Sequence, residues 1–336
     1  MNYIFIILGV IIYMSVVMDI IKTTLSMQGG GWLTSPMSHG IWLLFLKLSG
    51  QNGRSRMLDH VGYLLLVIIL LFWILGLWGS FFLILLSESG SIISSSTRLP
   101  ADAWEKFYYA GFTVSTLGVG DFIGSQIEWR ILTDVYALTG LVLITMSITY
   151  FLPVLSGVIK QRNLGIMLSS MGQSAQQLVL SSWDGKSFHR LTAQASDVSN
   201  MLIEHSQNHK AYPVIHYFHT HKAKHAIVLR IATLYDALLI LNQYVKSDIR
   251  PSKDDLSSLQ TALENYIEVI TEVSSINKKG TMPELPKVNM LIEKGLVEQQ
   301  AVLDSVDDAT RQARIVLAKL VKEDGWKWQD LQNTTS

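Results

Sequence analysis

The sequence predicts an all-α membrane protein whose second half is a soluble helical bundle. Three stretches stay apolar for about the 20 residues that a helix needs to cross a bilayer: residues 3–21, 61–86 and 131–159. Only 17 of the 54 charged side chains lie in residues 1–165, so the first half is as poor in charge as a membrane protein. After position 165, apolar residues recur at helical spacing.

Charge and cysteine content exclude several classes of function. The 27 basic and 27 acidic side chains cancel, which argues against a basic protein that coats nucleic acid. The absence of cysteine removes disulfides, thiolate metal sites and cysteine nucleophiles. No phosphate-binding loop or catalytic signature occurs, so an enzyme is not expected.

The first apolar stretch is expected to remain in the protein as a membrane helix. It is interrupted only by Asp19, and it lacks the basic start and the small-residue cleavage site of a signal peptide. Residues 41–48, between the first two stretches, are too short to span. With Trp32, Trp42 and Lys47 around them, they are expected to form a helix in the membrane interface.

Basic side chains orient the spans. They precede the second span and follow the third: Lys47, Arg54, Arg56, Lys160 and Arg162. Because short basic loops face the cytoplasm, residues 87–128 are expected outside and the second half of the chain inside. The N-terminus is then outside, or inside if the first helix does not span. We therefore expect a multi-pass protein of the cell membrane.

The outside loop contains the segment that carries the function. It reads WEKFYYAGFTVSTLGVGDF over residues 104–122, after a polar helix start at Asp102. Gly118 and Gly120 can adopt positive φ, which lets successive carbonyls point to one side. Non-helical backbone at membrane depth is tolerated where it lines a water-filled path. A ring of carbonyls from several chains can replace the hydration shell of a monovalent cation.

Residues 113–121, TVSTLGVGD, resemble the potassium channel signature, in which a Thr-Thr pair precedes Val-Gly-Tyr-Gly-Asp. The resemblance extends back to residues 107–109, where such channels have an aromatic Phe-Trp-Trp cuff, and forward to Gly140, at the position of the family's hinge glycine. It covers residues 61–159. It implies a two-helix-plus-pore-loop channel core for these residues, to which hydropathy and helical spacing add an extra N-terminal membrane helix and a C-terminal cytoplasmic helical bundle. It also implies a homotetramer, in which three identical subunits and the lipid bilayer are the partners.

By position, the resemblance assigns the ion ligands of the selectivity filter to Thr116, Leu117, Gly118, Val119 and Gly120. It assigns filter support to Tyr108, Tyr109 and Asp121, with Asp121 at the outer mouth. Because Val119 stands where the family has Tyr, the hydroxyl that would reach the cuff is missing, and the two tyrosines are expected to support the filter by packing.

The expected function is a potassium-selective channel, with K⁺ as the permeant ion and no cofactor. A weakly selective cation channel is one alternative, and a non-conducting membrane-anchored receptor or scaffold is another. A loop that only packs leaves the polar Ser115, Thr116 and Asp121 at membrane depth unexplained. No run of Arg or Lys marks a voltage sensor, and no GxGxxG marks a nucleotide-binding domain, so the gating ligand or protein is unknown.

The expected domain order has three parts. Residues 1–58 hold the N-terminal membrane helix and the interfacial helix. Residues 59–162 form a pore domain, whose parts are an outer helix (61–86), a pore helix (103–115), the filter (116–121) and an inner helix (129–160). Residues 163–336 form a cytoplasmic helical regulatory domain.

The inner helix is expected to contain the gate. Its hydroxyls at Thr145, Ser147 and Thr149 fit pore lining and bonding to the preceding turn equally well. Hinge and gate positions are Gly140, Phe151, Pro153 and Gly157. Pro153 should kink the helix, and the apolar side chains of residues 151–159 can close a constriction. The alternative is a kink that only steers the helix around its neighbours.

Four apolar stripes with an average step of 3.5 residues predict a left-handed bundle of antiparallel helices in the second half. They are Phe188–Leu202, Ile227–Val245, Leu256–Val273 and Val302–Leu320. Breaks at Pro213, Pro251 and residues 279–286 separate them. Trp326 and Trp328 are expected to anchor the packing.

Six of the nine histidines lie within 21 residues: His205, His209, His216, His219, His221 and His225. The pairs His205 with His209 and His221 with His225 would each share a helix face. The plain interpretation is a wet, basic surface with one or two satisfied core histidines. The alternatives are pH sensing by the last four histidines, or binding of Zn²⁺ or Ni²⁺ by the pairs.

Overall fold

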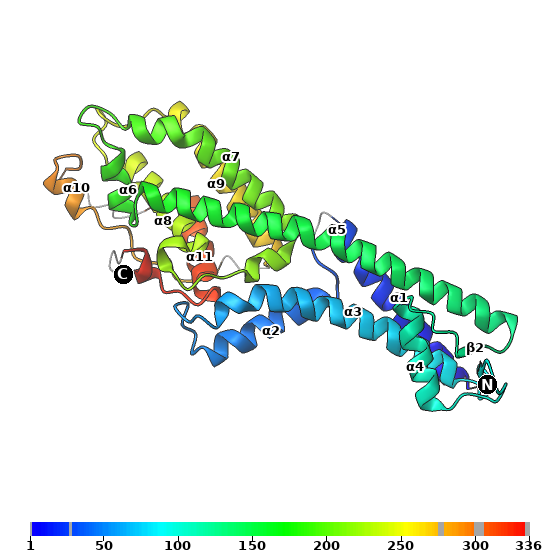
Figure 1. Ribbon diagram of the computed structural model, residues 1–336. Coiled ribbons are helices and arrows are strands. Elements are labelled where there is room, and N and C mark those ends of the chain that lie inside the picture. Colours follow the sequence, from blue (N-terminus) through cyan, green and yellow to red (C-terminus); the bar gives the residue numbers. More distant parts are fainter. Residues whose placement is uncertain (1, 27–28, 275–278, 299–305, 333–336) are drawn as a thin grey trace. The chain divides into compact units, whose positions relative to one another are not determined.

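The computed structural model describes residues 2–26, 29–274, 279–298 and 306–332 (Figure 1). Three helices are long and apolar enough to cross a membrane: α1 (Tyr3–Leu25), α3 (Val61–Leu86) with the 3-10 turn before it, and α5 (Ile127–Met171). The predicted all-α membrane class and its three apolar spans are confirmed.

The remaining helices are shorter. They are α2 (Thr34–Leu48), α4 (Ala103–Val114), α6 (Ala175–Ser182), α7 (His189–Ala211), α8 (Ile227–Gln243), α9 (Lys253–Val273), α10 (Asn289–Glu293) and α11 (Asp308–Glu323). Four 3-10 turns accompany them: η1 (Leu58–His60), η2 (Pro213–Tyr217), η3 (Ala223–His225) and η4 (Trp328–Leu331). Nothing in the apolar stripes distinguished α6 or α10 in advance, because both are short.

The chain folds as two compact units. The membrane unit consists of Met1–Ser38 and Tyr63–Pro153, and the helical unit consists of His39–Gly62 and Val154–Ser336. The expected boundaries at 58 and 162 follow hydropathy and charge, whereas packing places residues 39–62 and the end of α5 in the helical unit. The change of unit within α5 falls directly after Pro153.

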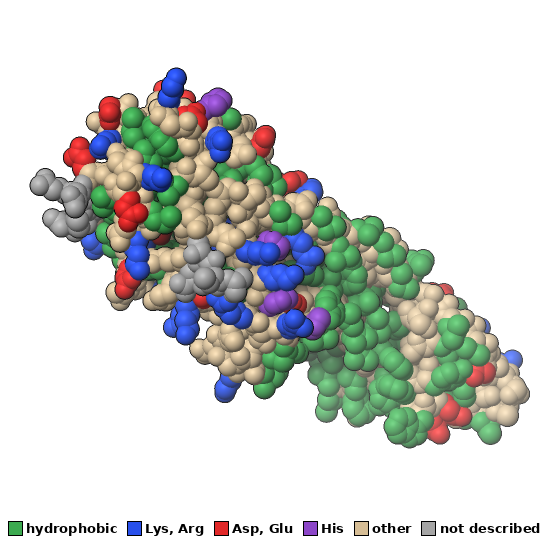
Figure 2. Space-filling model, turned by 60° about the vertical axis from the view of Figure 1, so that its left-hand side comes forward, with side chains coloured by type: hydrophobic (Ala, Val, Ile, Leu, Met, Phe, Trp, Pro, Cys, Tyr) green, Lys and Arg blue, Asp and Glu red, His purple; other side chains and the backbone are tan. Residues whose placement is uncertain are grey.

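Side-chain chemistry on the surface separates the two units. Figure 2 shows a broad band of hydrophobic side chains on the membrane unit, while most of the Lys, Arg, Asp and Glu side chains visible in this view lie on the helical unit. The exposed apolar residues of α1, α3 and α5 include Ile7, Leu71 and Leu138, which are 59, 48 and 63% exposed. A bilayer covers such side chains, so the exposed apolar surface agrees with the three predicted spans.

Asp19 fixes α1 to the rest of the membrane unit. The carboxylate is fully buried, and its Oδ2 accepts the indole N–H of Trp73 in α3 at 2.9 Å. Its Oδ1 accepts the backbone N–H of Leu33 at 2.8 Å, just before α2. A buried carboxylate is tolerated because donors surround it. The one charge that interrupts the first apolar stretch is therefore a packing anchor.

The helix α5 is longer than expected. The predicted end at residue 160 is wrong, because the helix continues to Met171. Its last turns place Leu164, Leu168 and Met171 in the core of the helical unit, where they are 0, 1 and 6% exposed. That burial favours continued helix beyond the charged residues that suggested an end. Pro153 lies inside the helix, and a kink there stays a prediction.

A two-stranded sheet was not anticipated from the sequence. Strand β1 (Ile92–Ser94) pairs antiparallel with β2 (Phe122–Gly124), with Ile93 opposite Ile123. Each strand has only three residues, which is too short for an alternating pattern to stand out. The pairing ties the loop after α3 to the segment that follows the glycine-rich run.

The helical unit buries the predicted stripes. Helix α7 packs along α9, and α6 and α11 pack against α8. The first three stripes are confirmed by buried residues that include Leu191, Leu234 and Leu259, each 0% exposed. The last stripe is partly wrong: α11 begins at Asp308, capped by Asp307, and Val302 lies outside the described residues.

The expected interfacial helix at 41–48 is part of the longer α2, and Trp42 does not anchor it in lipid. Trp42 is 2% exposed, and its indole N–H donates to the Glu323 carbonyl at 3.0 Å. The expected packing role of Trp326 is confirmed, because it is 3% exposed and stacks on His219 with ring centroids 5.7 Å apart. These residues join the 39–62 segment to the C-terminal part of the helical unit.

Candidate functional site

The site begins at α4, the predicted pore helix. Asp102 and Glu105 form a capping box, with each side chain accepting the backbone N–H of the other at 2.8 and 2.7 Å. The helix ends at Val114, one residue before the expected end, because Ser115 is its C-cap. A dozen residues of helix therefore lead directly into the glycine-rich run.

The outer helix braces α4 through two side chains that the sequence did not single out. The indole N–H of Trp78 donates to the Phe107 carbonyl at 2.8 Å, and the two rings stack at 4.5 Å. Lys106 is 3% exposed, and its ammonium donates to the carbonyls of Leu85 and Glu88 at 3.1 and 2.6 Å. These carbonyls lie at the C-terminal end of α3 and beyond it, where intrahelical donors are missing.

The backbone of the predicted filter alternates in conformation. Among its residues, Thr116, Gly118 and Gly120 have positive φ values of 60, 56 and 85°. The two glycines adopt this region without steric cost, whereas a non-glycine residue there is strained by about 1–3 kcal/mol. The positive φ of Thr116 was not foreseen. Alternation of left-handed and ordinary φ lets successive carbonyls turn to one side of the chain.

Both ends of the filter are tied to neighbouring structure. At the entry, the N–H groups of Thr116 and Leu117 donate to carbonyls of α4, each at 2.9 Å. At the exit, the Asp121 carbonyl accepts from the N–H and the hydroxyl of Ser95 at 2.8 and 3.0 Å. The sheet β1–β2 begins directly after Asp121. The strained run is thus held at both ends by ordered backbone.

Between those ends, the filter lies open in a single chain. Residues 115–121 are all exposed, and the apolar side chains of Leu117 and Val119 are 70 and 50% exposed. A Cβ added at Gly118 or Gly120 would meet nothing within 4 Å. Nothing in one described chain surrounds this segment, so a second surface is needed to enclose it.

The tyrosine cuff uses a hydroxyl group as well as its rings. The Tyr109 ring is 3% exposed, and its hydroxyl lies 2.7 Å from the Thr133 hydroxyl of α5. The Tyr108 ring packs edge-on against the rings of Phe112 and Phe122, with centroids 5.1 and 6.3 Å away. The Tyr109 hydroxyl thus joins α4 to α5, and the support of the filter by the two tyrosines stays a prediction. Thr133 carried no signal in the sequence, because its role appears only when α4 and α5 are packed.

Gly140 lies where α5 passes the end of the pore helix. A Cβ at this position would clash with the carbonyl oxygen of Val114. The close approach of α5 to α4 therefore explains why position 140 is a glycine. The hinge role that the resemblance assigns to Gly140 stays a prediction. The inner-helix hydroxyls bond backward: Thr145, Ser147 and Thr149 donate to Leu141, Leu143 and Met146 carbonyls at 3.1, 2.8 and 2.9 Å.

The other gate residues lie on the continuous helix α5. Phe151 is partly buried and its ring lies 5.9 Å from that of Tyr150. Gly157 is buried, and a Cβ there would lie 2.6 Å from the Ile215 side chain of η2. Leu155, by contrast, is 44% exposed. The gate segment therefore has a packed side at Gly157 and an open side at Leu155.

The histidines do not form one site. His219 is 7% exposed, its Nδ1 lies 2.9 Å from Asp324 Oδ1, and its Nε2 donates to the Gly53 carbonyl at 2.7 Å. Burial lowers the pKa of His219, but Asp324 and the Gly53 carbonyl outweigh it, so this pKa is raised. Both ring nitrogens face acceptors, which favours the charged imidazolium.

The prediction that His221 and His225 share a helix face is wrong. His221 lies before η3, with its Nδ1 2.5 Å from Asp59 Oδ2, while His225 ends the 3-10 turn, so they share no helix face. His216 lies in η2, with its ring 5.4 Å from that of His209. Within the described parts of the chain, no group of three metal-ligating side chains is placed to hold a metal ion.

The first pair does share a face of α7, but that face is internal. His205 and His209 are 2 and 3% exposed, with ring centroids 5.9 Å apart. Nδ1 of His205 and both ring nitrogens of His209 have no hydrogen-bond partner among the described residues. Burial and the nearby His216 lower the pKa of His205 to about 4 and also lower that of His209. The prediction of a solvent-exposed surface is therefore wrong for His205 and His209.

Comparison with known proteins agrees with this geometry. Residues 65–156 match the model of a protein family described as "Ion channel", a range that contains the predicted pore helix, the predicted filter and the predicted gate residues up to Pro153. The chain is also 26% identical over 331 residues to "Uncharacterized membrane protein YdjJ" of Bacillus subtilis (strain 168), covering 98% of this chain and 96% of the relative. No solved structure matches the chain. The molecule is thus a mostly helical membrane protein in which residues 65–156 are similar to an ion-channel family.

Proposed function

We propose that this protein is a potassium-selective channel that works as a homotetramer. The observation that carries the proposal is the alternation of positive φ at Thr116, Gly118 and Gly120, directly after a pore helix and inside the ion-channel region. A backbone with this alternation can present a row of carbonyls to one axis. Carbonyl oxygens at close spacing replace the water around a dehydrated K⁺ ion.

The electrostatics of the site favour a cation. The C-terminal end of α4, which carries a partial negative charge, leads into the filter at Val114. Asp121 adds a carboxylate at the other end of the filter. No Lys or Arg occurs between residues 107 and 129, so no basic side chain within the segment that contains the filter opposes a cation.

Four copies of the filter complete the proposed site. One exposed strand cannot surround an ion, and Leu117 and Val119 expose apolar side chains that a bilayer-spanning assembly would cover. Closed cyclic symmetry is an ordinary solution for a homo-oligomer and places equivalent carbonyls in rings. The fourfold arrangement follows from the family resemblance of residues 113–121.

Selectivity for K⁺ over Na⁺ depends on how firmly the filter is held without the usual Tyr. Support for the selective channel comes from two contacts around the filter: Ser95 donates to the Asp121 carbonyl, and the Tyr109 hydroxyl bonds to Thr133. A weakly selective cation channel is the second candidate, favoured by the loss of the aromatic side chain at Val119.

Gating is proposed to come from the helical unit, on the cytoplasmic side. Helix α5 carries the filter-side residue Gly140 and continues without interruption into the core of the helical unit at Leu164. A rearrangement of that core acts on the same helix that holds the gate segment 151–159. The basic residues near the spans support a cytoplasmic location for this unit.

Conductance of purified protein in planar bilayers tests the proposal. With K⁺ on one side and Na⁺ on the other, a selective channel gives a reversal potential far from zero. A reversal near zero identifies the weakly selective channel instead. Gly118→Ala is expected to abolish the current, because a Cβ at a φ of 56° forces the filter backbone to shift.

Gly79→Ala is the matched control. Like Gly118, Gly79 has nothing within 4 Å of an added Cβ, but it lies in α3 without positive φ. Its current should equal that of the parent protein. A folded, assembled protein that passes no current under any condition would point to the receptor or scaffold alternative.

A further inference from the structure

The loop between α7 and α8 lies against the ends of two helices that carry predicted membrane spans. An added Cβ at Gly62, in the first turn of α3, would lie 2.6 Å from the Phe218 ring. The Phe218 carbonyl accepts the side-chain amide of Gln161 in α5 at 3.2 Å. Further along the loop, an added Cβ at Gly165 of α5 would lie 2.7 Å from the His225 carbonyl oxygen. This loop therefore lies where α3 begins and where the apolar part of α5 has just ended.

The contact with α5 is at the depth of lipid headgroups. The predicted apolar span ends at Ile159, and Arg162 follows about 4.5 Å further along the helix axis. The headgroup layer on each side of a bilayer is about 5–8 Å thick. Arg162 is exposed, so its guanidinium lies in this layer. The loop packs one turn further on, at Gly165, from where long basic side chains can extend back toward the headgroups.

Cations from three segments converge on His225, which is partly buried at the end of η3. Burial lowers the pKa of His225, and four nearby cations lower it further: Lys224, Lys222, Arg162 and Arg230. Of these, Arg230 is buried in α8, whereas the other three are exposed. We call the surface formed by Lys222, Lys224 and Arg162 the juxtamembrane basic surface. Its lysines come from the loop and its arginine from α5, so only the fold brings them together.

No carboxylate of the described residues neutralises this surface. The side chains of Lys222, Lys224 and Arg162 make no ion pair and no hydrogen bond with the described part of the chain. Lys160 of α5, by contrast, pairs with Glu204 at 2.6 Å. Like charges held close together repel one another, and a bound anion removes that repulsion.

We propose that the juxtamembrane basic surface binds the headgroup of an anionic phospholipid. A phosphodiester at headgroup depth can accept from both ammonium groups and from the guanidinium. Its acyl chains then lie along the exposed apolar side chains of the spans. Basic side chains at a membrane surface attract anionic lipids in this way. Free phosphate has the same oxygen chemistry but lacks the acyl chains that hold a headgroup at this depth.

A zwitterionic lipid fits this surface less well. Phosphatidylcholine carries the same phosphate as phosphatidylglycerol, but its quaternary ammonium would approach the three cations and be repelled. The proposal therefore predicts a preference for phosphatidylglycerol. It does not rest on the proposed channel function, since a membrane protein that passes no current would bind the lipid in the same way.

Thermal unfolding of the full-length protein in dodecyl maltoside measures this preference. Dioleoyl phosphatidylglycerol is expected to raise the midpoint of unfolding by about 2 °C or more at saturation. Dioleoyl phosphatidylcholine, which has the same acyl chains, is expected to raise it by less than half as much, and inorganic phosphate not at all. About 0.5 M NaCl should raise the half-saturating concentration of phosphatidylglycerol several-fold, because salt screens the charges.

The double variant Lys222→Gln/Lys224→Gln locates the surface. Both side chains are exposed, so the substitutions leave the core untouched. The half-saturating concentration of phosphatidylglycerol is expected to rise at least about tenfold. Arg162→Gln should raise it as well. Native mass spectrometry counts the lipid molecules bound to each protein, which keeps the comparison independent of any change in stability.

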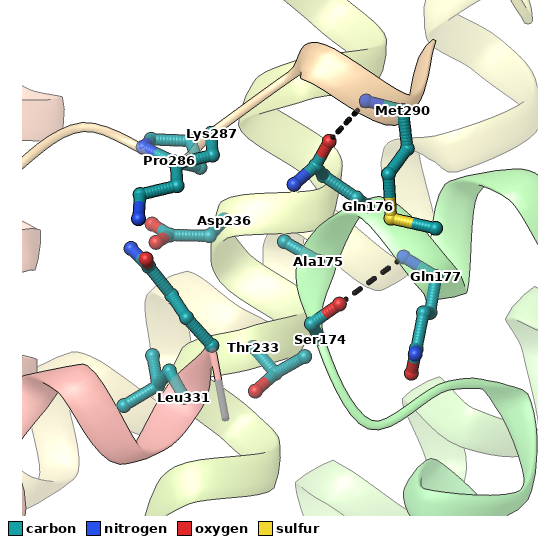
Figure 3. A pocket seen from close by; sticks show the side chains of 11 residues that line it. Ser174, Ala175, Gln176, Gln177, Thr233, Asp236, Pro286, Lys287, Met290 and Leu331 are labelled. Atoms are coloured by element: carbon teal, nitrogen blue, oxygen red, sulfur yellow. Dashed lines mark hydrogen bonds between the residues drawn. The ribbon is translucent and has the colours of Figure 1, made fainter. Parts of the chain in front are cut away.

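The double variant Lys287→Gln/Lys294→Gln is the matched control. It removes the same charge from two exposed lysines elsewhere in the helical unit. Lys287 lines a cavity on the same side as Asp236, so it has an acidic neighbour (Figure 3). Lys294 is the C-cap of the short helix α10. This variant should bind phosphatidylglycerol as the parent protein does.

Three results would overturn the proposal. They are equal shifts with the two phospholipids, undiminished binding in the Lys222→Gln/Lys224→Gln variant, and a shift with inorganic phosphate as large as that with phosphatidylglycerol. The last result would indicate a site for a soluble anion instead. Lipid binding by a protein that passes no current would contradict the proposed channel function alone, and a conducting channel without the lipid preference would contradict this proposal alone.

Discussion

The hydroxyl groups of Tyr109 and Thr133 lie 2.7 Å apart and join the pore helix to α5. The Thr133 hydroxyl also donates to the Trp129 carbonyl at 2.7 Å, so the tyrosine is held by a group that is itself fixed to its own helix. The contact therefore ties the predicted pore helix to the helix on which the gate is predicted.

Tyr109→Phe is expected to weaken ion selectivity more than it weakens folding. The change removes one hydrogen bond, about 1 kcal/mol, while it keeps the buried ring. The bi-ionic reversal potential should move toward zero, with the assembled protein still recovered by gel filtration. Tyr136→Phe is the matched control, since the Tyr136 hydroxyl lies 3.0 Å from the Ser80 hydroxyl within the same unit. Equal shifts in the two variants would contradict a specific role for Tyr109.

Gly140→Ala is expected to destabilise the membrane unit by about 1–3 kcal/mol. The added Cβ would meet the Val114 carbonyl oxygen, a backbone atom that cannot rotate away. The midpoint of thermal unfolding in detergent measures the loss. Gly79→Ala, which adds a Cβ into open space in α3, should leave the midpoint unchanged or raised. A Gly140→Ala protein as stable as the parent would show that α5 does not approach α4 this closely.

The reactivity of a cysteine introduced at position 155 is expected to differ between the open and the closed gate. The chain has no native cysteine, so a thiol introduced there is the single reactive one. Leu155 is 44% exposed on the gate segment, whereas Gly157 packs against Ile215. Leu155→Cys should react with a charged thiol reagent from the cytoplasmic side faster in conditions of high open probability. Reaction at the same rate in closed channels would place the gate elsewhere.

Acid is expected to destabilise the helical unit through His205 and His209. The folded protein holds these rings neutral with a lowered pKa, about 4 for His205, while the unfolded chain takes up protons near 6.5. Because the unfolded state binds more protons between these values, stability falls as the pH drops from 6.5 toward 4. The loss from His205 alone is about 3 kcal/mol.

Unfolding midpoints between pH 4 and 8 test this effect in His205→Asn and His209→Asn, with the exposed His189→Asn as control. The two buried variants should flatten the decline at acid pH, and the control should not. A decline of the same size in all three would assign the acid sensitivity to other groups.

His219 is expected to change the stability of the fold with pH in the opposite direction to His205 and His209. Its pKa is raised by Asp324 and the Gly53 carbonyl, so the stability that it contributes is full below its unfolded pKa and is lost as the pH rises through its folded pKa. His219→Gln should therefore lower the unfolding midpoint more at pH 5.5 than at pH 9. A difference that does not depend on pH would show that the ring acts by packing alone.

The sequence by itself determined the apolar spans, the glycines at alternate positions in the predicted filter, and the buried stripes of α7, α8 and α9. These features are local, because hydropathy, glycine at alternate positions and the 3.6-residue period are written in consecutive residues. The capping box is local in the same sense, because Asp102 and Glu105 lie three positions apart in the sequence. The family resemblance of residues 113–121 then gave the filter its expected function.

Only the tertiary structure decided which side chains support those features. Trp78, Lys106 and Thr133 matter because α3 and α5 pack against α4, and no pattern in the chain marks such a contact. The histidine cluster shows the same limit: six residues close in sequence divide into buried neutral rings at His205 and His209, and an ion-paired ring at His219. Charge and burial are properties of the packed surroundings, so spacing along the chain predicted the cluster and packing assigned its parts.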